Sequence, residues 1–188
     1  MEMDTLFLIK EKNGMQKDFS ILLSMMEYAR FTTIQEVENL SVDMLDYRCH
    51  DEANSIGMLL AHADAVEKIY QVLTFENLSE MEIEEYAMTL EPALSLGSKA
   101  AEVIHGNGVQ FYLDQLQSTR EQTIAQFKQL DESWLFEECD WWYGHKGNNY
   151  FKWFHVFEDE INHRGQIRMI KKLYAKENRK ETTESLDS

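Results

Sequence analysis

The stretch NSIGMLLAHADAVEKIYQVLTF, residues 54–75, decides the fold class of this 188-residue chain. Its apolar side chains recur at every third or fourth position, which is the period of a helix with one buried face. The residues of this apolar stripe are Ile56, Leu59, Leu60, Ala63, Val66, Ile69, Tyr70 and Leu73. Asp51, Asn54 and Ser55 stand just ahead of the run, and side chains of these types cap helix N-termini. The stretch predicts a long amphipathic helix, and one polar residue, His62, falls on its apolar stripe.

Three other segments show the same helical period. They run from about Gln16 to Asn39, from about Gly108 to Leu130 and from about Asn149 to Lys176. Four long helices predict an all-α four-helix bundle. The second and third helices are separated by Glu76 to Asn107, and a link of this length predicts a long crossover rather than a tight hairpin. The crossover contains an acidic, helix-like stretch.

The connection from Trp134 to Tyr150 is rich in aromatic side chains. We expect it to form an ordered loop or a short hairpin packed on the bundle. No long alternation of period two appears elsewhere, so a larger sheet is not required. The polar tail from Lys180 to Ser188 is expected to fray. The sequence therefore predicts one domain over residues 1–188, with short flexible termini.

The composition excludes several classes of protein. A chain with 44% hydrophobic residues can bury a core, and one Pro with eight Gly are too few chain breakers for a turn-rich β-sandwich. A formal charge of −16 argues against nucleic acid as a partner. Two cysteines, Cys49 and Cys139, make neither a disulfide framework nor a Cys-rich zinc site. The apolar run from Leu6 to Ile9 is too short for a signal peptide and no membrane-spanning run appears, so we expect a cytoplasmic protein.

The charge is unevenly distributed along the chain. Residues 164–180 contain seven basic side chains and one acidic side chain, Glu177, whereas the rest of the chain is strongly acidic. Basic residues at the C-terminal end of a helix complement its dipole, so a solvated basic helix end is one interpretation. The other is a surface that attracts an anionic cosubstrate.

The fourth predicted helix carries three polar residues on one side. His155, Asp159 and His163 are spaced four apart, so they share a helix face, and this face continues into apolar residues such as Ile167. Burying imidazole and carboxylate groups is unfavourable unless they are paired or bind a metal. His62 lies on the buried face of the second helix, and it could meet Asp159 and His163 at one ion. Three protein ligands leave a coordination position open, as in catalytic metal sites.

Each of these residues also has a purely structural interpretation. His62 could be a hydrogen-bonded core histidine, and Asp159 with His163 could form a buried pair without metal. His155 could donate to a backbone carbonyl or to Asp159. The remaining histidines fall in predicted loops, where we expect them to be solvated: His50, His105 and His145.

Two motifs make the chain similar to a known group of proteins. Residues 55–63, SIGMLLAHA, and residues 155–167, HVFEDEINHRGQI, resemble the DinB-like superfamily of four-helix metal-binding proteins, which includes bacillithiol S-transferases. The resemblance implies that His62 is the first metal ligand, residue 159 the second and His163 the last. The family usually has histidine at the middle place, where this chain has Asp159.

The resemblance implies one divalent transition metal as the cofactor. Two histidines and a carboxylate suit zinc, nickel, manganese or ferrous iron, and the sequence does not choose among them. His155, one turn before Asp159, is better placed as an outer partner or a proton carrier than as a fourth ligand. The implied activity is metal-dependent transfer of a low-molecular-weight thiol to an electrophile, so the expected partners are a small-molecule thiol or electrophile. The alternatives are a metal-dependent hydrolase and a non-catalytic or stress-related metal-binding bundle.

A second apolar flank of the fourth helix concerns assembly. Phe154, Phe157 and Ile161 lie away from the stripe that carries Asp159. The family resemblance favours a homodimer contact here. The alternative is that the crossover or the Trp-rich connection covers this flank.

Overall fold

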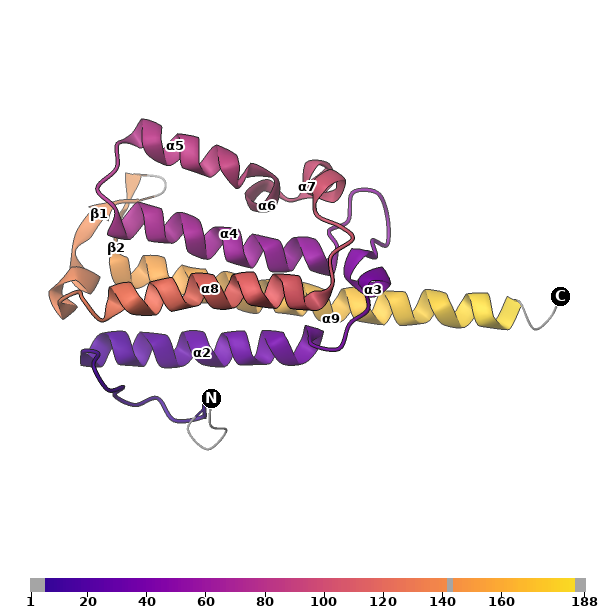
Figure 1. Ribbon diagram of the computed structural model, residues 1–188, viewed down its shortest axis with the longest axis horizontal. Helices are drawn as coiled ribbons and strands as arrows, with labels where there is room; N and C mark the ends of the chain where they lie inside the picture. Colours follow the sequence, from indigo (N-terminus) through magenta and orange to yellow (C-terminus); the bar gives the residue numbers. More distant parts are fainter. Residues whose placement is uncertain (1–5, 142–143, 185–188) are drawn as a thin grey trace.

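The computed structural model describes residues 6–141 and 144–184, and these form an all-α bundle with one very small sheet. Four long helices run side by side: α2 (Lys17–Val37), α4 (Ile56–Phe75), α8 (Val109–Phe127) and α9 (Asn149–Glu184) (Figure 1). Helix α2 packs against α9, and α4 packs against both α8 and α9. The predicted four-helix bundle is therefore confirmed. Among the described residues, no helix combines the length and the apolar character needed to cross a membrane.

Local signals explain where α4 begins and how closely it packs. The Ser55 side chain accepts a hydrogen bond from the backbone N–H of Met58, which satisfies a free donor of the first turn. A Cβ atom at Gly57 would lie 2.7 Å from the Tyr112 hydroxyl oxygen. Only glycine therefore allows α4 to approach α8 this closely. The predicted stripe is buried at most of its positions, but Leu73 near the end of the helix is exposed.

The crossover between α4 and α8 consists of three short helices. The predicted acidic stretch forms α5 (Glu80–Thr89), and α6 (Glu91–Ser95) and α7 (Gly97–Val103) follow. They lie along the outer side of α4 (Figure 1). Leu96 and Gly97 both have positive φ, so the backbone turns sharply between α6 and α7. A short helix α3 (Val42–Asp46) joins α2 to α4.

The aromatic connection between α8 and α9 contains a 3₁₀ turn and a hairpin. The turn spans Glu132–Phe136, and strands β1 (Glu138–Asp140) and β2 (Lys146–Asn148) pair antiparallel, with Cys139 opposite Gly147. The prediction of an ordered loop or short hairpin is confirmed. Trp134 stacks on Phe19 of α2, so this connection closes one end of the core.

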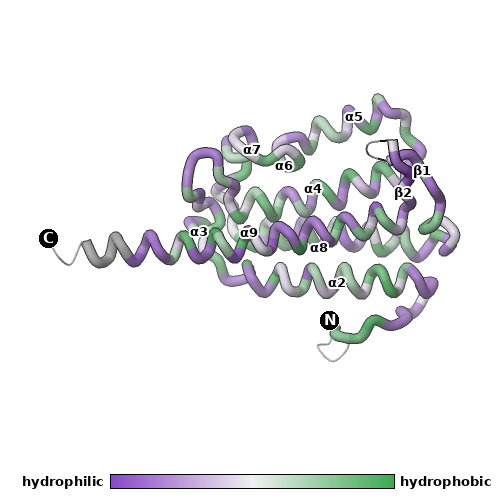
Figure 2. Tube along the Cα trace, turned by 180° about the vertical axis from the view of Figure 1, so that it is seen from behind, coloured by the Kyte–Doolittle hydropathy of each residue, from purple (hydrophilic) through white to green (hydrophobic). Residues whose placement is uncertain are grey.

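Helix α9 is longer than predicted. We expected it to end near Lys176 and the tail from Lys180 to fray, but the helix continues to Glu184. The segment after Lys176 contains no Gly or Pro to stop the helix, and its Glu, Lys and Arg residues favour helical backbone. This part of α9 projects beyond the bundle (Figure 1), and the stretch just after Lys176 that is coloured in Figure 2 is hydrophilic. The residues after Glu184 lie outside the described part.

Three basic residues of α9 contact α2. Arg168 and Lys171 both bind the Glu36 carboxylate, and Arg164 donates to the backbone of Ala29. Pairing with α2 thus accounts for part of the basic cluster that the sequence shows.

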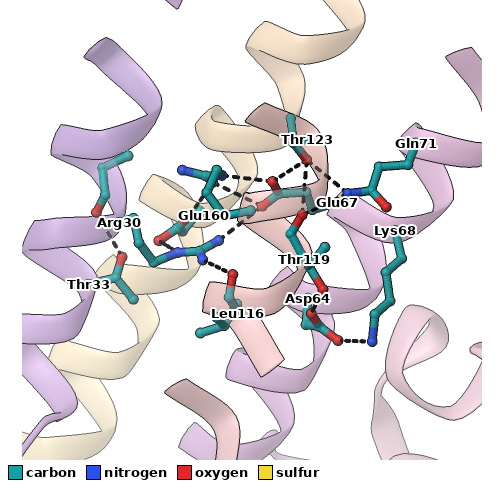
Figure 3. A network of polar contacts seen from close by, with 12 residues as sticks. Arg30, Thr33, Asp64, Glu67, Lys68, Gln71, Leu116, Thr119, Thr123 and Glu160 are labelled. Carbon is teal, nitrogen blue, oxygen red and sulfur yellow. Dashed lines mark hydrogen bonds and ion pairs between the residues drawn. The ribbon is translucent and has the colours of Figure 1, made fainter. Parts of the chain in front are cut away.

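A layer of four charged side chains divides the core into two apolar clusters. One cluster surrounds Phe19, Phe127 and Trp153, and the other surrounds Leu59 and Ile167. The layer between them takes one residue from each long helix, and all four are nearly inaccessible to solvent: Arg30, Glu67, Arg120 and Glu160. Figure 3 labels three of them, Arg30, Glu67 and Glu160.

Each carboxylate of this layer contacts both guanidinium groups. Arg30 donates to Glu160 at 2.9 Å and to Glu67 at 3.2 Å. Arg120 donates to both oxygens of Glu67, at 2.7 and 3.0 Å, and lies 3.8 Å from a Glu160 oxygen. Burial alone would raise the pKa of the Glu67 carboxyl, but the charges of Arg120 and Arg30 outweigh burial and lower it. With two arginines and two glutamates, the layer is balanced in formal charge.

The second apolar flank of α9 is partly covered by a segment that the sequence did not suggest. Phe157 is buried, whereas Phe154 and Ile161 remain partly exposed. Neither the crossover nor the aromatic connection closes the pocket of about 340 Å³ at this flank; residues from the N-terminal segment, α2 and α9 line it, among them Phe7 and Tyr28. Figure 2 shows this apolar N-terminal segment beside α2.

The charged layer predicts a large effect of one nearly isosteric substitution. Glu67→Gln leaves Arg30 and Arg120 buried with one counter-charge fewer, so the free energy of unfolding should fall by about 3–5 kcal/mol. Urea denaturation followed by circular dichroism measures this change. The matched control is Glu36→Gln, which removes a more exposed ion pair and should cost less than about 1 kcal/mol. Equal effects of the two substitutions would contradict the role assigned to the layer.

Candidate metal centre

Two adjacent helices bring the three predicted ligand residues together. His62 lies near the middle of α4, and Asp159 and His163 lie on consecutive turns of α9. Because α4 packs along α9, the two faces meet, and the candidate ligand atoms of all three residues lie within 4.8 Å of one another. We call these three residues the triad.

The Asp159 carboxylate lies between the two imidazoles. One oxygen, Oδ2, is 3.4 Å from His62 Nε2, and the other, Oδ1, is 3.4 Å from His163 Nε2. The two imidazole rings are 4.8 Å apart between centroids and nearly perpendicular. Contacts of 3.4 Å are longer than good hydrogen bonds between nitrogen and oxygen, which are 2.7–3.2 Å. The triad therefore converges without tight pairing.

A backbone carbonyl of the crossover holds His62 in place. His62 Nδ1 lies 2.8 Å from the carbonyl oxygen of Ala93 in α6. A carbonyl can only accept a hydrogen bond, so Nδ1 is the protonated nitrogen and Nε2 points toward Asp159. Metal-binding histidines are oriented in this way, by a hydrogen bond from the nitrogen that does not bind the metal. This partner could not be predicted from the sequence, because any residue type can supply a main-chain oxygen.

Contacts within the site shift the pKa values of Asp159 and His62 toward their charged forms. Burial would raise the pKa of the Asp159 carboxyl, but the contacts with His163 and His62 outweigh burial and lower the pKa well below its usual range. Burial would lower the pKa of His62, but its contacts with Asp159 and Ala93 raise it. The triad thus combines a carboxylate charge with imidazoles that face it.

Two buried polar atoms of the triad have no hydrogen-bond partner among the described residues. They are Asp159 Oδ2 and His163 Nδ1. Leaving such atoms unsatisfied is unfavourable. Asp159 Oδ2 faces His62 Nε2 at 3.4 Å, so a group bound between these two atoms is the natural explanation for that oxygen. Two imidazole nitrogens and a carboxylate are ligands that suit a divalent transition metal. The residues present therefore fit the metal that the sequence implied.

The other histidines take no part in the triad. His155 Nδ1 lies 3.1 Å from Glu158, so its carboxylate contact is with Glu158 rather than with Asp159. His50, His105 and His145 are exposed, as predicted for loop residues.

Sequence reasoning missed an aromatic contact of His155. Tyr70 was assigned only to the core stripe of the second helix, but its ring centroid lies 6.0 Å from that of His155 and 6.2 Å from that of Trp141. The signal was available, since Tyr70 follows His62 by about two helical turns. The position of Trp141 depends on the hairpin, which local pattern does not fix.

Comparisons with known proteins agree with this architecture. Residues 21–175 match the family described as mycothiol-S-transferase. A crystal structure of a conserved protein from Enterococcus faecalis has the same fold, with a TM-score of 0.61 and 14% identity over 81% of this chain and 94% of that one. No protein with a curated description matches the sequence. Because the family match extends over most of the chain, the chain belongs to the mycothiol-S-transferase family of DinB-like proteins.

Proposed function

We propose that this protein is a metal-dependent transferase that joins a low-molecular-weight thiol to an electrophile, with His62, Asp159 and His163 as the metal ligands. The observation that carries the proposal is the Asp159 carboxylate, whose two oxygens each face an imidazole nitrogen at 3.4 Å. The family to which the chain belongs supports the thiol as substrate, and mycothiol is the thiol that the family description names.

Each residue of the triad has a defined task in this proposal. A bound divalent metal would lower the pKa of a thiol in an open position and so supply a thiolate at neutral pH. The Ala93 carbonyl fixes the ring of His62, and Asp159 contributes a negative charge that reduces the net charge of the loaded site. The site is only partly buried, with the His62 and Asp159 side chains 12% and 17% exposed, so a small thiol can reach it.

The carboxylate ligand bears on the metal. Oxygen donors suit manganese and ferrous iron, and imidazole suits zinc and nickel as well, so all four remain candidates for a mixed set. The choice depends on supply as much as on affinity. The identity of the bound metal must therefore be determined by elemental analysis.

Metal binding is one test of the proposed function. The protein purified without chelator should carry about one equivalent of a divalent transition metal, as for a single three-ligand site with an open position. His62→Ala and Asp159→Asn should each weaken binding by more than the roughly 10–100-fold that loss of an outer partner costs. Elemental analysis and calorimetric titration measure stoichiometry and affinity.

Two exposed histidines provide matched controls for this experiment. His105→Ala and His145→Ala remove imidazoles that lie outside the triad and should leave metal affinity unchanged. A wild-type protein that neither retains nor rebinds metal would instead support the interpretation of Asp159 and His163 as a buried pair without metal.

Catalysis of thiol transfer is another test of the proposed function. Metal-loaded protein should catalyse addition of mycothiol or bacillithiol to an electrophile, and chelation or His62→Ala should abolish the acceleration, because the thiol loses its activating ion. Liquid chromatography with mass detection follows the thioether product. Equal rates with wild-type protein and His62→Ala would exclude this chemistry. Metal-dependent hydrolysis of an ester without thiol would favour the hydrolase instead.

We also infer that the apolar flank beside Phe154 and Ile161 contacts a second copy of the chain. Both side chains are more than two-fifths exposed, and Phe7 of the N-terminal segment extends the same apolar surface. Light scattering should therefore give the mass of a dimer at micromolar concentrations. Ile161→Lys should shift the protein to a monomer without loss of helix content. A wild-type monomer at high micromolar concentration would rule out this contact.

A further inference from the structure

The crossover helix that holds His62 is too short to keep its position by itself. Helix α6 has five residues, and the Ala93 carbonyl that accepts a hydrogen bond from His62 lies in the middle of it. Isolated helices shorter than about 12–15 residues are marginal in water, so α6 keeps its place only through contacts with the rest of the molecule. The orientation of the His62 ring therefore depends on what anchors α6.

The turn that follows α6 also needs support from its surroundings. Leu96 has a φ of 58° and a ψ of −160°, a backbone conformation that glycine adopts far more readily than leucine. Residues held in this way persist only where the surrounding structure fixes them. The Leu96 N–H donates to the Pro92 carbonyl at 3.2 Å, and its side chain packs against the apolar cluster around Leu59 and Ile167.

Asn54 connects this turn to α4. Its side-chain oxygen, Oδ1, accepts a hydrogen bond from the backbone N–H of Gly97 at 3.1 Å. Asn54 directly precedes Ser55, the N-cap of the helix that carries His62. The segment 93–97 is thus bound to the α4 region at both of its ends, by the Ala93 carbonyl at one end and by the Gly97 N–H at the other.

We propose that Asn54 is a positioning residue of the metal centre, which acts through α6 on the imidazole of His62. The inference rests on the proposed metal centre and adds a residue that is not one of its ligands. With the Asn54 amide in place, α6 keeps its carbonyl against His62 Nδ1, so that Nε2 stays directed toward Asp159. Without the amide, Gly97 loses this tether, and the carbonyl no longer fixes the ring and its tautomer.

Metal affinity tests this role, with Zn²⁺ as the probe. Asn54→Ala removes the acceptor, so the Kd for Zn²⁺ should rise by roughly tenfold, the lower end of the range for loss of an outer hydrogen-bond partner. Asn54→Leu is similar in size to asparagine and should have the same effect, and it remains available if Asn54→Ala does not fold. Asn54→Asp keeps an acceptor oxygen and should hold the Kd within about threefold of the wild-type value. Calorimetric titration of the metal-free proteins measures all four.

Asp46 provides a matched control in the same crossover. It is partly buried, as Asn54 is, and its Oδ2 accepts a hydrogen bond at 2.8 Å from the backbone N–H of Gly106, which also has a positive φ. This bond lies beyond α7 and does not involve α6. Asp46→Ala should therefore keep the Kd for Zn²⁺ within about threefold of the wild-type value, because no outer partner of a ligand is disturbed.

A second measurement follows His62 in the absence of metal. The proton on His62 Nδ1 should exchange slowly with water and give a resolved signal in nitrogen-edited NMR spectra, because a carbonyl oxygen 2.8 Å away accepts it. The loss of this signal in His62→Ala identifies it. Asn54→Ala and Asn54→Leu should broaden or abolish the signal, whereas Asn54→Asp and Asp46→Ala should retain it. The melting temperature of each variant shows that it is folded.

The outcomes distinguish the two proposals. If the wild-type protein binds Zn²⁺ and Asn54→Ala binds it as tightly, with the NMR signal retained, the positioning role is wrong and the metal centre stands. Equal losses of affinity in Asn54→Ala and Asp46→Ala would also contradict the role, because any loosening of the crossover would then suffice. If the wild type binds no divalent metal, the metal centre fails and the role of Asn54 falls with it. A loss in Asn54→Ala and Asn54→Leu that Asn54→Asp restores supports both.

Discussion

Four charged side chains, one from each long helix, meet in the middle of the bundle, and the register of the helices depends on them. Arg30, Glu67, Arg120 and Glu160 satisfy one another only if α2, α4, α8 and α9 stand at one relative height. Sliding any helix by one turn would bury an unpaired charge, which is far less favourable than exchanging one apolar contact for another. Asp159 directly precedes Glu160, so the same layer sets the height at which α9 presents its part of the triad to His62.

The parts of the structure that follow from a local, periodic sequence pattern could be predicted from the sequence. Helical periodicity located all four long helices, and the polar residues at His62, Asp159 and His163 interrupted apolar stripes that were otherwise regular. The charged layer was not found, because its partners lie between 37 and 130 positions apart and nothing local marks Arg30 as the partner of Glu160. The continuation of α9 to Glu184 was missed for a different reason, since a solvated polar helix has no apolar stripe to follow.

The carboxylate at position 159 affects how the three side chains of the triad contact one another, even without a bound metal. A third histidine would present one nitrogen to the centre, whereas Asp159 presents an oxygen to each neighbouring imidazole. The carboxylate also links α4 to α9, because its contacts with both imidazoles lower the pKa of Asp159 and its contact with His62 raises the pKa of that imidazole. This departure from the three-histidine pattern is thus compatible with a preorganised site.

The hydrogen bond from His62 to the Ala93 carbonyl links the triad to the crossover, which contributes no side chain to the triad. Because the acceptor belongs to the main chain, many side chains could replace Ala93 without disturbing it. What must be preserved is the path of the backbone through α6, which the turn at Leu96 and Gly97 helps to define. Relatives could therefore diverge freely in crossover sequence while keeping the imidazole fixed. A change in crossover length would alter the triad even though no residue of the triad had changed.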